Sequence, residues 1–79
     1  MKHRIVVRAV WDGEAGVWVA SSEDIAGLAV EAETIEALQR KIPPVIEDLI
    51  EMDGLEFDLR EIPVEIRSEA YLTVLNPAH

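Results

Sequence analysis

The hydrophobic periodicity of this chain changes twice, and these changes limit the folds it can adopt. Apolar and polar residues alternate along residues 4–11, 17–20 and 28–32, which is typical of half-buried β-strands. Between Thr34 and Gly54 the apolar residues recur every three or four positions, as on one face of a helix. Alternation returns over residues 62–74. The pattern therefore predicts an α+β protein with the element order β-β-β-α-β.

The connections between these elements predict the topology of the sheet. The segment Asp12–Gly16 contains Asp-Gly and a second glycine, so it favours a tight hairpin between the first two strands. A right-handed crossover through the helix places the fourth strand parallel to the first. We expect a four-stranded, mainly antiparallel sheet in the order 3-2-1-4, with one helix on one face. The side of the first strand that is predicted to face this helix consists of Ile5, Val7, Ala9 and Trp11.

The helix carries signals at both ends and a disturbance in its middle. Thr34 is a suitable N-cap, because its hydroxyl can accept from a free backbone N–H, and Gly54 suits the residue after the last turn. The predicted apolar stripe begins at Ile35 and ends at Met52. Pro43 and Pro44 both lack an N–H. They predict a kinked helix that bends over the sheet, or two short helices.

The last strand is predicted to be much longer than the first. At ~3.3 Å per residue, residues 62–74 would span roughly 43 Å, whereas the first strand has about eight residues. The strand must then bend at Ser68 or extend past its neighbour. Because an unpaired strand end can pair with another chain, we expect a homodimer. The residues expected at its interface are Ala70, Tyr71, Leu72, Thr73 and Val74.

Composition narrows the function classes. Seventy-nine residues predict one domain, residues 1–79. The formal net charge of −9 opposes binding to phosphate backbones, so direct nucleic-acid binding is not expected. No apolar stretch approaches the ~20 residues of a membrane span, so no membrane association is expected. The chain has no cysteine, which rules out disulfides and thiolate metal clusters and fits a cytoplasmic location.

Residues that could carry catalysis do not form a recognisable constellation. A metal-dependent nuclease needs converging carboxylates, but Asp12, Asp24 and Glu33 are predicted at different ends of strands. The serines have no histidine nearby. His3 and His79 stand alone at the two ends of the sequence. We therefore expect a protein that is not an enzyme and uses no cofactor and no metal.

The stretch between the second and third strands contains a polar run and a glycine. Ser21, Ser22, Glu23 and Asp24 precede Gly27. Gly27 suits a backbone conformation that a side chain would obstruct, and Asp24 is a candidate to accept from free N–H groups of the loop. This segment is interpreted as a structural corner, with a docking role as the alternative.

Three segments together carry a resemblance to a known family. They are an aromatic strand at residues 18–20, an Asp-x-x-Gly corner at residues 24–28, and an acid-Thr helix start at residues 33–38. In this order they resemble the HicB antitoxin family, and more narrowly a group of small stand-alone HicB-like domains. The resemblance covers about residues 5–52. Proline commonly precedes the glycine in that family, whereas this chain has Ala26.

The resemblance implies a partial RNase H-like fold without nuclease activity. HicB proteins bind and neutralise a small, basic, RNA-cleaving toxin, and most also carry a C-terminal DNA-binding module. No such module is recognised in this sequence, so direct operator binding is not expected. The resemblance implies an antitoxin-like protein-interaction domain; the alternative is a homo-oligomeric structural or regulatory module without a toxin. The residues expected to contact a basic partner are Arg4, Arg8, Trp18, Asp24, Asp48, Glu51, Asp53, Glu65 and Glu69.

Overall fold

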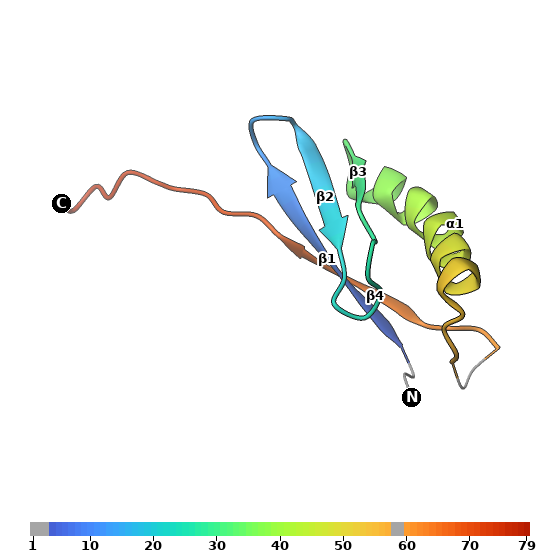
Figure 1. Cartoon of the computed structure of the whole chain (residues 1–79). Coiled ribbons are helices and arrows are strands. Elements are labelled where there is room, and N and C mark those ends of the chain that lie inside the picture. The colour runs from blue at the N-terminus through green and yellow to red at the C-terminus, as the bar shows by residue number, and fades with distance from the viewer. Residues whose placement is uncertain (1–3, 58–59) are drawn as a thin grey trace.

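Four strands form one sheet, and one helix covers one of its faces (Figure 1). The structure is a computed structural model and describes residues 4–57 and 60–79, so His3 lies outside the described residues. The sheet has the order β3-β2-β1-β4, with β4 parallel to β1 and the other pairs antiparallel. The predicted class, element order and strand order are confirmed. The elements are β1 (Ile5–Asp12), β2 (Val17–Ser21), β3 (Val30–Ala32), α1 (Ile35–Asp53) and β4 (Val64–Glu69).

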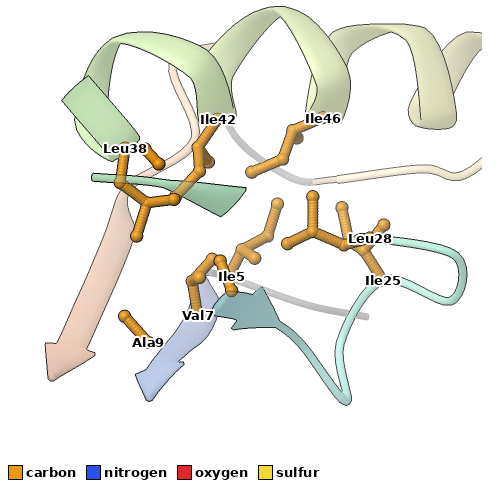
Figure 2. Close-up of a cluster of buried hydrophobic side chains, with 10 residues drawn as sticks. Ile5, Val7, Ala9, Ile25, Leu28, Leu38, Ile42 and Ile46 are labelled. Carbon is orange, nitrogen blue, oxygen red and sulfur yellow. The ribbon is translucent and has the colours of Figure 1, made fainter. Parts of the chain in front are cut away.

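The hydrophobic core lies between the sheet and α1. Figure 2 shows side chains of α1 facing those of β1 across this layer. Ile25 and Leu28, which come from the connection between β2 and β3, close one side of the core, and Ile25 is completely buried. The sequence pattern assigned Ile25 to a loop and missed its role in the core. The buried apolar residues are Ile5, Val7, Ala9, Ala20, Ile25, Leu28, Ala32, Leu38, Ile42 and Ile46.

The helix forms as one 19-residue element. The predicted N-cap is confirmed, since the Thr34 hydroxyl accepts from the N–H of Ala37 at 3.0 Å. Gly54 ends the helix in the left-handed conformation, with φ of 65°. The alternative of two separate helices is wrong, because α1 continues through Pro43 and Pro44. Both prolines are exposed, so water can hydrate the carbonyls that have lost their N–H donors.

The two tryptophans lie on the helix-facing side of the sheet, but at its margin. Trp11 is opposite Trp18 in the β1–β2 ladder, and the two rings are 5.3 Å apart at an interplanar angle of 59°. The prediction that Trp11 belongs to the core is wrong, since 38% of its surface remains exposed. Trp11 is the last but one residue of β1, and in Figure 1 the tip of the β1–β2 hairpin extends past the start of α1.

The fourth strand ends much earlier than the alternation predicts. The parallel ladder begins at Ile5↔Val64 and ends at Val10↔Glu69. Because β1 reaches its turn after Asp12, residues beyond 71 have no neighbouring strand with which to pair. Residues 70–75 continue as an exposed extended segment that leaves the sheet (Figure 1). The predicted strand over residues 62–74 is therefore wrong in its length, although its alternation holds within β4.

Candidate protein-interaction surface

The sheet face turned away from α1 is not covered by any helix or strand of the described residues. We call it the open face. Its centre is apolar, because Val6, Val10 and Val19 project between charged side chains, and Val19 is 38% exposed. The charged side chains that the strand register places on this face are Arg4, Arg8, Glu31, Glu65, Arg67 and Glu69.

Ion pairs hold the charged groups of the open face together across β1 and β4. Arg8 binds Glu69 in a bidentate manner, with Nε to Oε1 at 2.7 Å and Nη2 to Oε2 at 2.8 Å. Arg4 donates to Oε1 of Glu65 at 3.0 Å, and Arg67 donates to the other oxygen of the same carboxylate. Such exposed pairs stabilise a fold weakly. Their main effect is to fix the side chains and to neutralise this face.

The pairing shifts the acidity of both glutamates. Hydrogen bonds from Arg8 and from the Tyr71 hydroxyl lower the pKa of Glu69 to about 2. The Glu69 carboxylate in turn raises the pKa of Arg8 above its usual value. The hydrogen bond from Arg67, together with the charge of Arg4, lowers the pKa of Glu65. Both carboxylates are therefore charged at neutral pH and already have cationic partners.

The polar corner after β2 completes the edge of β1. Where the ladder of β2 stops, Asp24 Oδ2 accepts from the backbone N–H of Val6 at 2.8 Å, and Ser22 Oγ donates to the Val6 carbonyl at 2.7 Å. The N–H of Asp24 donates to Ser22 Oγ at 3.0 Å. Two side chains thus replace the backbone of a partner strand. A depression of about 500 Å³ lies beside them, between this corner, Arg8 and Arg67.

Gly27 ends this corner in a conformation that requires glycine. Its φ is +87°, and a Cβ at this position would lie 3.5 Å from Cδ2 of Leu49. The expectation for Gly27 is confirmed, and the hydrogen bond from the Val6 N–H gives Asp24 the role of acceptor. This hydrogen bond links the corner to β1.

Positive and negative charges balance on the open face, so the acidic excess of the chain lies outside this face, in part on α1. The last two turns of α1 present Asp48, Glu51 and Asp53, and no basic residue occupies the last turn. We call Asp48, Glu51, Met52, Asp53 and Leu55 the helix-end surface. None of its three carboxylates forms an ion pair with a side chain of the described residues.

The helix-end surface is unfavourable for the stability of α1 itself. The C-terminus of a helix carries a partial negative charge, so acids there are repelled and bases are favoured. Met52 is 79% exposed and Leu55 is 37% exposed beside these acids. The prediction that Met52 continues the buried stripe is wrong. The stripe follows Leu38, Ile42 and Ile46 in steps of four, and Met52 is rotated about 120° from Ile46.

The structure separates the predicted partner-binding residues into groups. Arg4, Arg8, Glu65 and Glu69 meet on the open face, whereas Asp48, Glu51 and Asp53 share the end of α1. Trp18 joins neither group: it is opposite Ala32 and Trp11, on the helix-facing side. Trp18 therefore does not share a surface with Arg4 and Arg8, because the register of β2 gives it the same side as buried Ala20.

The residues predicted for a dimer interface lie in the exposed segment after β4. Tyr71 is 79% exposed, Leu72 91% and Val74 89%. Ala70 and Thr73 are also exposed. The interface predicted from the sequence ended at Val74 and did not include Leu75, which is 97% exposed. The continuous apolar run through residue 75 was the signal that could have included it.

Within residues 4–57 and 60–79, no group of three or more His, Asp or Glu side chains is arranged to hold a metal ion. The one helix in those residues is too polar to cross a membrane.

No curated protein matches the chain significantly. The crystal structure of a hypothetical protein from the extremely thermophilic bacterium Thermus thermophilus is similar, with a TM-score of 0.71 and 45% sequence identity over 92% of this chain and 99% of that one. The model of a family described as Domain of unknown function (DUF1902) matches residues 4–73. The chain therefore belongs to the DUF1902 family.

Proposed function

We propose that this chain is a non-enzymatic protein-binding domain that neutralises a small basic protein by covering it, as HicB antitoxins do with their RNA-cleaving toxins. The chemistry of the partner follows from the surfaces. The open face is close to neutral, and two of its three carboxylates, those of Glu65 and Glu69, are engaged by arginines. The helix-end surface has carboxylates without such partners. A basic protein is therefore the partner whose charge is complementary to the helix-end surface.

The observation that carries this proposal is the acidic end of α1. Asp48, Glu51 and Asp53 oppose the helix dipole, and Met52 exposes an apolar side chain among them. Each acid near a helix C-terminus costs ~0.3–1 kcal/mol. Residues that destabilise their own helix or strand, and do not stabilise the fold elsewhere, are expected at functional sites. A basic partner offsets this cost by pairing with the carboxylates and by providing an apolar contact for Met52.

The test compares two variants of equal charge. In the first, Asp48→Asn, Glu51→Gln and Asp53→Asn neutralise the helix-end surface. In the control, Glu14→Gln, Glu23→Gln and Glu33→Gln remove the same charge from exposed loops. Each tagged protein is used at low salt to capture small basic proteins from native lysate, and the captured protein is assayed for RNA cleavage with and without the wild-type chain.

We expect the wild-type and control chains to capture the partner and suppress its RNA cleavage, and the helix-end variant to fail. Raising the salt should weaken the wild-type complex, since screening acts on exposed charges. The helix-end variant should be at least as stable as the wild type. Equal capture by all three chains, or a captured protein whose cleavage is not suppressed, would refute the proposal.

A second candidate function is a self-assembling module without a basic partner. It is favoured by the exposed apolar segment after β4, where Leu72 and Leu75 are more than nine-tenths exposed. A basic partner and self-assembly are compatible, because the helix-end surface and this segment are different parts of the chain.

A further inference from the structure

The segment after β4 is uncharged and mostly apolar, although it is exposed. Residues 70–75 read Ala-Tyr-Leu-Thr-Val-Leu and contain no charge. In β4 itself the alternation is amphipathic, with Val64 and Ile66 on one side and charged residues on the other. A short, mostly apolar run of this kind is typical of a strand that is paired and packed against other parts of a protein. In this chain, however, Leu72, Val74 and Leu75 lie in solvent.

The outer edge of β4 is a matching acceptor for such a strand. Within the described residues β4 pairs only with β1, so its other edge presents free backbone groups. Beside this edge, on the helix side, lies a groove of about 340 Å³ between α1 and β4. It is lined by Gln39, Ile42, Pro43, Val64 and Ile66. The groove offers apolar contacts to side chains of any strand added at this edge.

The segment cannot reach the edge of its own β4. Residues 70–75 continue in the direction of β4 without a turn (Figure 1). Covering that edge from within the chain would require a reversal before Ala70. A second copy, related by a two-fold axis perpendicular to the sheet, meets the same edge with its own segment running antiparallel. Each copy then donates one segment and receives one.

We infer that two copies of this chain exchange residues 70–75, each segment adding to the outer edge of β4 in the other copy. This inference rests on the self-assembly candidate and is independent of a basic partner. The two sheets join into one continuous sheet through their β4 strands. Since opposite residues of an antiparallel pair share a face, Val74 of one copy reaches the groove beside Ile66 of the other.

The pairing register follows from charge and from the length of the apolar run. A two-fold axis at Ala70 places the whole run opposite β4 and its extension, with Val74 facing Ile66, Leu72 facing Ser68 and Tyr71 facing Glu69. Centring the axis at Glu69 would bring two carboxylates face to face, which is unfavourable. Centring it at Ser68 would pair Leu75 with Glu61, beyond Pro63, which has no N–H to donate.

Single cysteines test this register directly, because the chain has none of its own. Opposite Cα atoms in an antiparallel pair are ~4.5–5.5 Å apart, within the range of a disulfide. Ala70→Cys should therefore form a disulfide-linked dimer under mild oxidation at low protein concentration. Thr73→Cys is the matched control in the same exposed segment, because its two copies lie about six residues, or ~20 Å, apart in this arrangement. Mixing Thr73→Cys with Arg67→Cys should restore cross-linking.

The mass in solution and a charged variant complete the test. Light scattering should give twice the monomer mass, and Leu72→Asp with Val74→Asp should raise the dimer dissociation constant at least about 100-fold, since an unpaired charge would be buried. These positions are exposed in the single chain, so circular dichroism should be unchanged. Added salt should not weaken the dimer, in contrast to the complex with a basic partner.

Either of two results would overturn the inference. A monomer at about 100 µM would exclude exchange and also remove the self-assembly candidate. A dimer that cross-links equally at positions 70 and 73, or survives both aspartates, would leave self-assembly standing but place the interface elsewhere. Neither result bears on the helix-end surface, whose test is the capture of a basic protein.

Discussion

Replacement of Asp24 by alanine tests whether the polar corner after β2 is structural. The Asp24 carboxylate accepts from the backbone N–H of Val6 at 2.8 Å in a half-buried position. Alanine leaves this N–H without that acceptor, at the point where the β2 ladder has stopped. We expect Asp24→Ala to lower the free energy of unfolding by ~1–3 kcal/mol, the cost of an unsatisfied, partly buried donor.

This loss is large for a chain of this size. A domain of 79 residues has a total stability of ~4–12 kcal/mol. Its entropy of unfolding is ~0.17 kcal/mol/K, so each kcal/mol corresponds to ~6 °C in Tm. Thermal unfolding should therefore show a Tm that is ~6–18 °C lower. Urea unfolding, followed by tryptophan fluorescence, should show an earlier midpoint with an unchanged slope.

Two companion variants make the measurement decisive. Glu23→Ala removes an exposed carboxylate between the two hydrogen-bonding residues and should change stability by less than ~0.5 kcal/mol. Ser22→Ala removes the donor to the Val6 carbonyl and, because Ser22 and Asp24 are linked, the double variant should cost less than the sum of the single ones. If Asp24→Ala is as stable as Glu23→Ala, the structural interpretation fails and the docking alternative gains weight.

Two further predictions concern backbone conformation and acid sensitivity. Gly27→Ala should lower the free energy of unfolding by ~1–2 kcal/mol in urea, because the φ of Gly27 is +87° and Leu49 is close. Gly13→Ala is the control, because the φ of Gly13 is not positive. The folded-state pKa of Glu69 is lowered to about 2, so its contribution is present above the ordinary pKa near 4.5 and is lost as the pH falls from there toward 2. Glu69→Gln should flatten the acid limb of the stability–pH curve in this window, and an unchanged limb would contradict the assigned ion pair.

Much of the fold is predictable because its signals are local. The hairpin between β1 and β2 and both ends of α1 depend on residues within a few positions of one another, such as Thr34 accepting from Ala37. The change of period at Thr34 separates sheet from helix. Once the element order is known, the right-handed crossover through α1 places β4 beside β1 and parallel to it.

The failures have a different cause, which is the length and the position of neighbouring elements. Alternation continues to Val74, but a strand needs a partner, and β1 ends at Asp12. Trp11 continues the core side of β1 but lies next to the end of the strand, where it stays exposed. Met52 has helical spacing to Leu49, yet the core selects the row with steps of four residues. None of these limits can be read from the residue itself.

The two candidate surfaces contain residues that are unfavourable in the single chain, and these residues are separate from those that stabilise its fold. The carboxylates at the end of α1 oppose the helix dipole, and the apolar side chains of residues 70–75 meet water. Neither feature contributes to the core between the sheet and α1. Changes there should therefore alter association while leaving monomer stability unchanged or higher, whereas changes at Asp24 or Gly27 should do the reverse. A variant at the helix end or in the segment that lost binding only by unfolding would contradict this division.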